Sequence, residues 1–589
     1  CSILADNDAR WCACYLGAFR IGAIVVPLDT NYSAAQVATV LAASGATLLI
    51  TGTRLLPVAE QALGGTSTRL VRMYRGDGDD RPSVDDMLAA PAVAPLPPCP
   101  STPGSPAVIL FTSGTTADPK GVVLSHGNLL GERDAAFAVV NVSEEDAVLG
   151  ILPLFHSLAQ VANLLLPFAV GARVVYLETL NTTDLLQALA ERGITIFVCV
   201  PQFFYLIHQR VTGEVQKGSW LRRRLYRLLL GTNLRLRAIG LNIGPTVFAR
   251  VHRVLGARMR LLVTGGSKFD PAIGRDLYGL GFTILQAYGL TETTGAATIN
   301  RQNEAHIDTV GRILPGNELR VLPPEGEADD GEVAIRGPIV MQGYYNRPDA
   351  TAAVMRDGWF LTGDLGRLDA DGRLTITGRK KEMIVLASGK NIYPEEIEAH
   401  YRKSTVIKEI CVMGLTRPDE PTTERLYAVI VLDQDVLRAR KITNAGELLR
   451  WEMEGLSADL PAHKRVLGYE VWFEPLPRTT TGKLRRFAIQ KRVAEQSAAK
   501  AASTAAPASA ADQDWLDDTH VANALALITR RAKAGASILP DANLELDLGL
   551  DSMERVELLT ELEQRFGLKV PEAVVHEIFT VRQLVDAVR

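Results

Sequence analysis

One stretch of the chain combines the residue types that hold polyphosphates. Residues 111–121 read Phe-Thr-Ser-Gly-Thr-Thr-Ala-Asp-Pro-Lys-Gly and follow an apolar run at 107–110. Hydroxyl groups donate to phosphate oxygens, glycine lets backbone N–H groups approach an anion, and lysine adds a positive charge. The spacing differs from the P-loop pattern of nucleotide hydrolases. We predict a strand that leads into a phosphate-binding loop. Its expected binding residues are Thr112, Ser113, Gly114, Thr115, Thr116 and Lys120.

A second group of polar residues follows another strand-like run, at 283–287. Tyr288 can stack on a base, Thr291 can donate to a phosphate, and Glu292 offers the carboxylate oxygens that Mg²⁺ prefers. Gly289 and, after the apolar run at 261–264, Gly266 are expected to form the accompanying turns. These residues predict a nucleotide and metal site.

Further charged residues lie downstream in glycine-containing segments. Asp364 follows Gly363, which predicts a turn, and its carboxylate could accept hydrogen bonds from both hydroxyls of a ribose. Arg379 lies at the end of a strand-like run, and Lys483 lies in a glycine-containing turn near the end of a small domain. If that turn is mobile, Lys483 can reach the other groups.

In this order, the motifs resemble those of the adenylate-forming (AMP-binding) superfamily, and above all those of long-chain fatty acyl-CoA synthetases. The resemblance implies that Arg379 contacts the ribose, that Lys381 is a hinge, and that Lys483 bridges the acid carboxylate and the α-phosphate. It also implies that the loop with Gly389 forms the pantetheine tunnel after a rotation of the small domain. Ala117 departs from the family pattern, which usually has glycine there, and predicts a stiffer loop.

The last 75 residues predict a separate helical unit. Leu-Gly-Leu-Asp-Ser at 548–552 precedes a segment with an apolar stripe at 553, 556, 559, 562 and 566. This unit resembles an acyl carrier protein, which implies that Ser552 carries 4′-phosphopantetheine and that a phosphopantetheinyl transferase is a partner. A plain helix-capping serine is the alternative.

The fold class that follows is α/β, with a large N-terminal adenylation domain of parallel sheets and helices. Alternating strands and helices in the first 300 residues predict the parallel sheets. A small mobile α+β subdomain and a four-helix acyl carrier domain complete the expected architecture. The predicted domains are 1–380, 381–494 and 515–589, with an Ala/Ser-rich tether at 495–514. The chain starts within a helix-like and strand-like pattern, so we expect that its first elements are missing.

Composition limits the functional classes. The 589 residues carry a net charge of −4, so no global field favours nucleic acid. Six scattered cysteines indicate a reduced, cytoplasmic setting, and no apolar run is long enough to span a membrane. The stretch at 220–227 alternates arginine with leucine and aromatic residues. It predicts peripheral contact with the inner membrane face or an acidic partner, or it is simply a solvated helix face.

The acid substrate is expected to lack an α-amino group. Peptide-synthetase domains use the aspartate of a Phe-Asp-x-Ser motif as the counter-charge for that group, and this chain has Phe155, His156 and Ser157 instead. By resemblance, His156 lies near the carboxyl end of the acid pocket, although a neutral packing histidine would look the same in sequence. The similarity of the arginine-rich segment to that of long-chain synthetases favours a fatty acid.

The resemblance implies ATP- and Mg²⁺-dependent formation of an acyl-adenylate. The acyl group would pass to the thiol on Ser552, to CoA, or to both, and a downstream enzyme would accept it. One alternative is a free-CoA ligase, which predicts turnover with CoA after removal of 495–589. Another is a non-catalytic adenylate-binding scaffold, which predicts broken catalytic positions, whereas Lys483, Glu292, Asp364 and Arg379 are all present.

Overall fold

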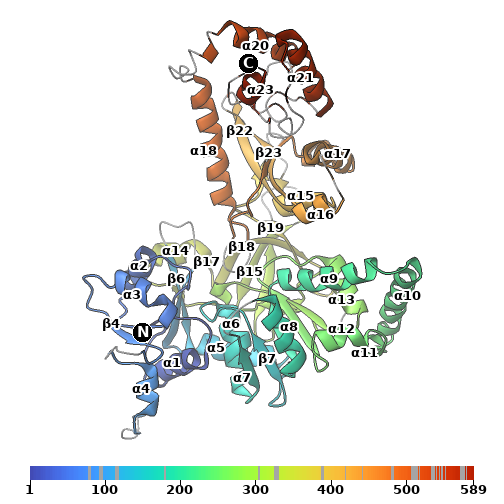
Figure 1. Ribbon diagram of the computed structural model, residues 1–589. Coiled ribbons are helices and arrows are strands. Elements are labelled where there is room, and N and C mark those ends of the chain that lie inside the picture. The colour runs from blue at the N-terminus through green and yellow to red at the C-terminus, as the bar shows by residue number, and fades with distance from the viewer. Residues whose placement is uncertain are drawn as a thin grey trace. The chain divides into compact units, whose positions relative to one another are not determined.

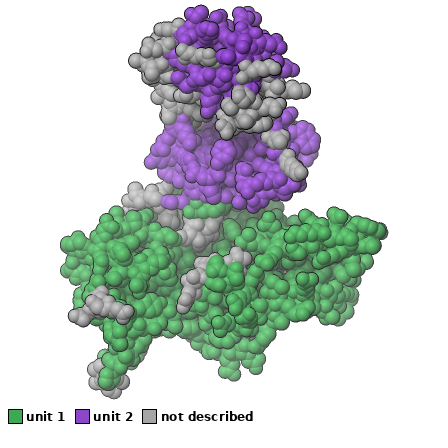
Figure 2. All heavy atoms as spheres, in the orientation of Figure 1, with its two compact units in different colours: residues 1–385, 389–396, 478–484 green, residues 386–388, 397–477, 485–589 purple. Residues whose placement is uncertain are grey.

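The computed structural model groups the chain into two compact units, coloured separately in Figure 2. Unit 1 comprises residues 1–385, 389–396 and 478–484, and unit 2 comprises 386–388, 397–477 and 485–589. Lys483 therefore belongs to unit 1 by its contacts, although unit 2 residues flank it in sequence. The structure describes all residues except 77–80, 92–96, 113–118, 178–180, 303–305, 324–329, 386–390, 418–419, 441, 443, 479–482, 506–514, 517, 532–537, 539, 541, 543, 545–547, 549, 551, 569, 571–577, 579 and 589.

A seven-stranded sheet in the order β13-β12-β11-β10-β9-β7-β8 runs through unit 1 (Figure 1). Strands β8, β7, β9, β10 and β11 are parallel, and β12 and β13 add an antiparallel edge. Parallel strands need crossover connections, which helices supply here. The strands are β7 (Ala147–Gly150), β8 (Arg173–Tyr176), β9 (Ile196–Cys199), β10 (Leu261–Gly265), β11 (Ile284–Tyr288), β12 (Thr298–Ile299) and β13 (Arg312–Ile313).

The helices of this region include one irregular segment and one long exposed helix. They are α5 (His126–Phe137), α6 (Ser157–Gln160), the π-helical segment η2 (Val161–Leu165), α7 (Leu166–Ala169), α8 (Thr182–Glu191), α9 (Pro201–Gln216), α10 (Trp220–Arg237), α11 (Gly244–Val247), α12 (Ala249–Val254) and α13 (Pro271–Gly279). The start of α5 is fixed by a capping box between Ser125 and Asn128. This cap makes the helix begin directly after strand β6 (Lys120–Ser125).

A smaller parallel sheet, β2-β1-β3-β4, confirms the expected alternation at the N-terminus. Ser33 and Gln36 form a capping box for α2, and Gly45 ends that helix with φ of 64°. The elements are β1 (Ser2–Leu4), α1 (Ala9–Arg20), β2 (Val26–Pro27), α2 (Ala34–Ser44), β3 (Leu48–Thr51), η1 (Thr53–Leu55), α3 (Leu56–Ala62), β4 (Arg69–Arg72) and α4 (Val84–Ala89).

Antiparallel strands complete unit 1. One sheet has the order β16-β6-β5, and another has β14-β15-β18-β17 with β19 paired to β18. The strands are β5 (Pro106–Thr112), β6 (Lys120–Ser125), β14 (Glu318–Leu322), β15 (Gly331–Arg336), β16 (Gly343–Tyr344), β17 (Met355–Arg356), β18 (Trp359–Leu368), β19 (Leu374–Arg379), β20 (Ile384–Val385) and β21 (Asn391–Ile392). A short 3-10 helix, η3 (Thr291–Thr293), and α14 (Pro348–Val354) lie in the same part of the chain.

The prediction of a turn at Asp364 is wrong. Asp364 lies within strand β18 and pairs across the ladder with Arg379 of β19. Gly363 has φ of 70°, and the ladder is irregular between Leu365 and Gly366. The glycine therefore marks a distortion inside a strand rather than a chain reversal.

Unit 2 contains a three-stranded sheet in the order β22-β23-β24. The buried carboxylate of Glu398 accepts hydrogen bonds from the Val412 N–H (2.8 Å) and from the guanidinium of Arg486. This contact links α15, β22 and α18. The buried negative charge of Glu398 is paired with the positive charge of Arg486, which offsets the cost of burying it. The elements are α15 (Pro394–Tyr401), β22 (Ile407–Arg417), β23 (Glu420–Leu432), α16 (Gln434–Ala439), α17 (Ala445–Ala458), η4 (Ala462–Lys464), β24 (Gly468–Trp472) and α18 (Arg486–Ala505). Helix α15 crosses the boundary between the two units in sequence.

The predicted tether begins inside a helix. Helix α18 continues to Ala505, so residues 495–505 are helical rather than an irregular linker. Alanine has the highest intrinsic helix propensity, which explains why a low-complexity Ala/Ser segment can extend a helix. Residues 506–514 of the predicted tether lie outside the described residues.

The carrier region has its own apolar core, to which Val521, Leu527, Leu559, Leu562 and Val585 contribute. Burial of Leu559 and Leu562 confirms that part of the predicted apolar stripe. The described helices here are α20 (Thr519–Arg531), α21 (Ser552–Phe566) and α23 (Val581–Ala587).

Candidate active site

The predicted phosphate loop connects two antiparallel strands. Thr112 at the end of β5 pairs with Lys120 at the start of β6, and the Thr112 hydroxyl donates to the Lys120 carbonyl oxygen (3.4 Å). The ends of the loop are thus held together by the ladder. Ser113, Gly114, Thr115 and Thr116 lie outside the described residues.

Several predicted site residues follow strands of the seven-stranded sheet at their carboxyl ends. His156 comes after β7, Gly266 comes after β10, and Tyr288 is the last residue of β11. Because β7, β9, β10 and β11 are parallel, these positions share one edge of the sheet. Open α/β sheets bind ligands at this edge.

The most closely connected polar group centres on Asp364, which is 3% exposed. Arg379 Nε lies 2.8 Å from Asp364 Oδ1, and the Tyr288 hydroxyl donates to Asp364 Oδ2 (2.7 Å). Burial and the negative charge of Asp364 raise the pKa of Tyr288 well above its usual value, so the phenol stays protonated. The structure thus brings three predicted nucleotide-binding residues into contact.

Lys483 lies close to the same group. Burial lowers the pKa of Lys483, and the positive charge of Arg379 acts in the same direction. The carboxylates of Asp364, Glu395 and Glu382 oppose this shift. Lys483 and Arg379 therefore place two cationic groups next to buried carboxylate charge, an arrangement suited to a polyanionic ligand.

His156 is the N-cap residue of α6 and is half-buried. Burial and the positive charge of Lys483 lower the pKa of His156 to about 4. The imidazole is therefore neutral at pH 7, with one nitrogen as donor and the other as acceptor. Lys483 is thus close enough to His156 to affect its protonation.

Glu292 lies in the turn η3 beside Thr291. The Tyr344 hydroxyl donates to Glu292 Oε1 (2.8 Å). Gly289 precedes this turn, and a Cβ there would collide with the carbonyl oxygen of Gly295, so the close backbone approach requires glycine. The tight turn explains why Glu292 points in a defined direction.

The donor set fits ATP with Mg²⁺. Within the described residues no group of three His, Cys, Asp or Glu side chains could hold a metal alone. Mg²⁺ commonly uses one or two carboxylates with substrate phosphates and water, and Glu292 suits that role. The buried Ser267 hydroxyl, next to Gly266, has no hydrogen-bond partner among the described residues and is available to a ligand.

Lys381 is exposed, and Gly389 is outside the described residues. Ser552 is the first residue of α21, as predicted for a helix start. The roles assigned to these residues stay predictions.

Two residues that sequence reasoning missed contact the site turns. Tyr344 contacts Glu292, and the fully buried Glu132 of α5 accepts a hydrogen bond from the Ala296 N–H at its Oε1 (2.9 Å). Glu132 Oε2 has no partner among the described residues. Burial raises the pKa of Glu132 to about 8, although the Ala296 bond acts in the opposite direction. Glu132 stands next to Arg133 and Asp134 in α5, so nothing in the local sequence marks it as buried.

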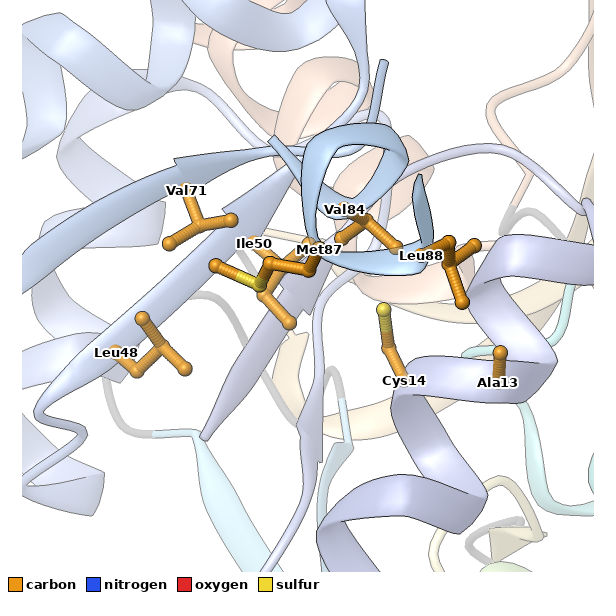
Figure 3. Close-up of a pocket in the computed structure, with 8 residues that line it drawn as sticks. All are labelled: Ala13, Cys14, Leu48, Ile50, Val71, Val84, Met87 and Leu88. Carbon is orange, nitrogen blue, oxygen red and sulfur yellow. The ribbon is translucent and has the colours of Figure 1, made fainter. Parts of the chain in front are cut away.

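An apolar pocket of about 220 Å³ lies away from these groups, between α1, β3, β4 and α4 (Figure 3). Its lining residues are Ala13, Cys14, Leu48, Ile50, Val71, Val84, Met87 and Leu88. Burial raises the pKa of the Cys14 thiol to about 11, so it is not a nucleophile at neutral pH. We assign no chemistry to this pocket. Among the described helices, none is long and apolar enough to cross a membrane.

The chain belongs to the AMP-binding enzyme family, whose pattern matches residues 1–345. Residues 520–588 match the phosphopantetheine attachment site family, so a carrier domain follows the enzyme domain. One similar relative is the long-chain-fatty-acid–CoA ligase FadD15 of Mycobacterium bovis. It is 34% identical over 465 residues, which are 75% of this chain and 74% of the relative.

Solved structures share the fold. ATP-bound MatB of Rhodopseudomonas palustris has a TM-score of 0.67 at 23% identity, covering 83% of this chain and 88% of MatB. The o-succinylbenzoate CoA synthetase MenE of Bacillus subtilis, in complex with ATP and magnesium, has a TM-score of 0.64 at 23% identity. This match covers 82% of the chain and 88% of MenE. These likenesses confirm the predicted α/β architecture.

Glu132 gives a pH-dependent prediction. Its pKa is about 8 in the folded protein and 4.5 without burial. At pH values between these two, the folded protein therefore binds one more proton than the unfolded chain. The stability of wild-type unit 1 should therefore fall as pH rises from 4.5 to 8, by an amount on the order of 5 kcal/mol. Glu132→Gln keeps an oxygen that accepts a hydrogen bond from the Ala296 N–H. The glutamine amide does not ionise, so the stability of this variant should not fall in the same way.

The measurement is the melting temperature of both proteins by differential scanning calorimetry from pH 5 to pH 9. The variant should melt near the wild type at pH 5 and several degrees higher at pH 9. A difference that is the same at every pH would contradict the assignment of a buried, titrating Glu132.

Proposed function

We propose that this protein activates a fatty acid with ATP and transfers the acyl group to a pantetheine thiol, on its carrier domain or on CoA. The observation that carries the proposal is the contact of Asp364 with Arg379 and Tyr288, with Lys483 near enough to feel the charges of Asp364 and Arg379. A carboxylate reacts poorly with thiols because oxide is a very poor leaving group. The acid must therefore first become a mixed anhydride.

In the first step a substrate carboxylate oxygen bonds to the α-phosphorus of ATP. The bond from that phosphorus to the bridging oxygen breaks, and pyrophosphate leaves with the electron pair. Lys483 would contact the carboxylate and the α-phosphate and offset the charge that accumulates there. No general base is needed, because the acid is already ionised at neutral pH. His156 is neutral, so it can donate a hydrogen bond near the acid carboxyl without adding charge.

The remaining site residues would hold the nucleotide. We propose that Tyr288 stacks on adenine, with Gly266 and Gly289 allowing close approach, and that Asp364 and Arg379 contact the ribose. Thr291 and Lys120 would bind phosphates together with the loop residues Thr112, Ser113, Gly114, Thr115 and Thr116. Glu292 would hold Mg²⁺, which when bound offsets the charge of the triphosphate. MenE and MatB, with the same fold, are described with bound ATP, and MenE also with magnesium.

In the second step the thiol sulfur bonds to the acyl carbon, AMP leaves with the electron pair, and the thiol proton passes to solvent. The phosphopantetheine on Ser552 would supply this thiol once a phosphopantetheinyl transferase has attached it. Because the carrier domain is joined to the enzyme domain in one chain, the arm would be presented to the enzyme domain at a raised local concentration. A downstream enzyme would then accept the acyl group.

We retain the domain division 1–380, 381–494 and 515–589 as part of the proposal. Lys381 is the proposed hinge, and its exposed position is compatible with a change of backbone angles there. The loop with Gly389 would then line the path of the pantetheine arm.

The substrate is proposed to be a long-chain fatty acid. The chain has Phe155, His156 and Ser157 where an amino-acid-activating domain would have an aspartate. FadD15 is named a long-chain-fatty-acid–CoA ligase, which also supports free CoA as the second candidate acceptor.

Helix α10 supports the proposed peripheral contact with a membrane. Its outer surface exposes Trp220 (61%), Leu221 (60%), Leu225 (53%) and Leu228 (65%). The intervening arginines at 222, 223, 224 and 227 are exposed as well. Apolar side chains flanked by arginine suit the interface of an anionic bilayer. A fatty acid held in such a bilayer would then be near the enzyme.

Replacement of Ser552 separates the two acceptors. After modification by a phosphopantetheinyl transferase, the full chain with ATP, Mg²⁺ and a fatty acid should gain the acyl mass in intact-mass spectrometry. Ser552→Ala should gain none, yet it should keep acid-dependent ATP–pyrophosphate exchange within about twofold, because Ser552 takes no part in adenylation.

Two outcomes would contradict loading of the fused carrier. One is equal acylation of Ser552→Ala and wild type. The other is wild-type pyrophosphate exchange without any acyl mass on the carrier. Acyl-CoA formation at equal rates by both proteins in the latter case would identify CoA as the acceptor.

Substitution on α10 tests the membrane contact. Co-sedimentation of the full chain should be stronger with phosphatidylglycerol-containing vesicles than with phosphatidylcholine vesicles, and it should weaken with salt. Leu225→Ser with Leu228→Ser, and separately Arg223→Glu, should reduce binding several-fold. Arg450→Glu, on the exposed surface of α17, is the matched charge control and should bind like wild type. Equal binding of all variants would refute the proposed contact.

A further inference from the structure

The short strand β16 joins two parts of the candidate site that are far apart in sequence. It pairs antiparallel with β6, the strand that begins at Lys120, and the Tyr345 N–H donates to the Gly121 carbonyl oxygen (2.7 Å). Just before β16, the Met341 N–H donates to the Glu292 carbonyl oxygen (2.8 Å). The strand is therefore bonded to the exit of the phosphate loop and to the turn that carries Glu292.

The side chain of Tyr344 also contacts both of these parts of the site. Its hydroxyl donates to Glu292 Oε1 (2.8 Å), while Lys120 Nζ lies 5.0 Å from the centre of its ring. Lysine over a tyrosine ring at this distance is a cation–π contact. One half-buried side chain thus contacts both the residue predicted to bind Mg²⁺ and the lysine predicted to bind phosphate.

The backbone around Tyr344 is also fixed. The Tyr344 N–H donates to the Thr351 hydroxyl of α14 (2.9 Å), and the Thr351 hydroxyl donates to the Arg347 carbonyl oxygen (2.9 Å). Gly343 has φ of 141° and packs so closely on Thr351 that a Cβ would lie 2.9 Å from its methyl carbon. The ring is therefore attached to a rigid support, and rotation of the Glu292 carboxylate would cost the Tyr344 hydrogen bond.

We propose that Tyr344 is a positioning residue, which orients Glu292 toward a divalent cation and keeps Lys120 at a fixed distance from that cation. The inference rests on the proposed function, because it assumes that Glu292 and Lys120 bind Mg²⁺ and phosphate. Tyr344 bonds to one oxygen of Glu292. Within the described part of the chain, this bond uses Oε1 only, which leaves Oε2 for a metal.

The two contacts can be separated by substitution. Tyr344→Phe removes the hydroxyl and keeps the ring over which Lys120 lies. It should weaken Mn²⁺ binding to the protein–nucleotide complex about tenfold or more, because loss of a partner behind a metal ligand typically has such an effect. Nucleotide binding without metal should stay within about twofold. Tyr344→Leu also removes the cation–π contact, so metal-free nucleotide binding should fall a further several-fold.

The experiment uses the full-length protein with a non-hydrolysable ATP analogue. Electron paramagnetic resonance measures Mn²⁺ affinity, and calorimetric titration measures nucleotide affinity with and without metal. Tyr345→Phe, the neighbouring tyrosine, is the matched control and should behave as wild type. Melting temperatures of all variants without ligand show whether folding is preserved.

The outcomes distinguish this inference from the proposed function. Wild-type Mn²⁺ affinity in Tyr344→Phe, or an equal loss of metal-free and metal-bound nucleotide affinity, would overturn the positioning role. Failure of the wild-type protein itself to bind the nucleotide and metal would instead count against the proposed function. A selective loss of metal affinity in Tyr344→Phe alone would support the inference.

Discussion

The pairing of Asp364 with Arg379 is the interaction on which the candidate site depends. A nearly fully buried carboxylate is costly unless opposite charge and hydrogen bonds compensate it, and Arg379 and Tyr288 supply both. The register between β18 and β19 sets Asp364 opposite Arg379, so the sheet itself fixes the pair. Lys483 adds a second cation near Arg379, and burial together with the charge of Arg379 lowers the pKa of Lys483. A polyanionic ligand would relieve the repulsion between these two cations.

The fold divides the site among segments with different degrees of constraint. Tyr288, Gly266 and His156 follow parallel strands of one buried sheet, and Lys120 and Tyr344 belong to a separate antiparallel sheet. Tyr344 bonds to Glu292 in the turn η3, and Glu132 accepts a hydrogen bond from the Ala296 N–H a few residues further on. Rigid elements therefore hold the groups that would bind ATP, whereas Lys483 arrives on a separate segment, 478–484, that lies far along the chain. This arrangement suits a reaction in which one cation is present for the first step only.

Local sequence patterns predicted those parts of the molecule that local physics determines. Apolar runs placed β7, β9, β10 and β11, and the motifs around Tyr288 and Asp364 indicated the site because their residue types carry the chemistry. The prediction of a turn at Asp364 was wrong because glycine usually indicates a turn, whereas Gly363 permits a distortion within a strand. The helix at the start of the predicted tether was missed because a low-complexity composition was read as a flexible linker. The high helix propensity of alanine was not taken into account.

Contacts between distant segments could not be predicted in this way. The bond from Tyr344 to Glu292 depends on a two-residue strand, β16, which is too short to leave a periodic pattern. Burial of Glu132 contradicts the usual expectation that a charged helix residue faces solvent, and only tertiary packing explains it.

The central claim is that Lys483 offsets the charge formed between carboxylate and α-phosphate. Acid-dependent ATP–pyrophosphate exchange of Lys483→Ala tests it most directly, with Lys491→Ala on the exposed surface of α18 as the control. The account predicts a loss of about 100-fold or more for Lys483→Ala, the size expected for a group that stabilises developing charge, and wild-type exchange for the control. Exchange by Lys483→Ala at the wild-type rate, with ATP bound normally, would contradict it.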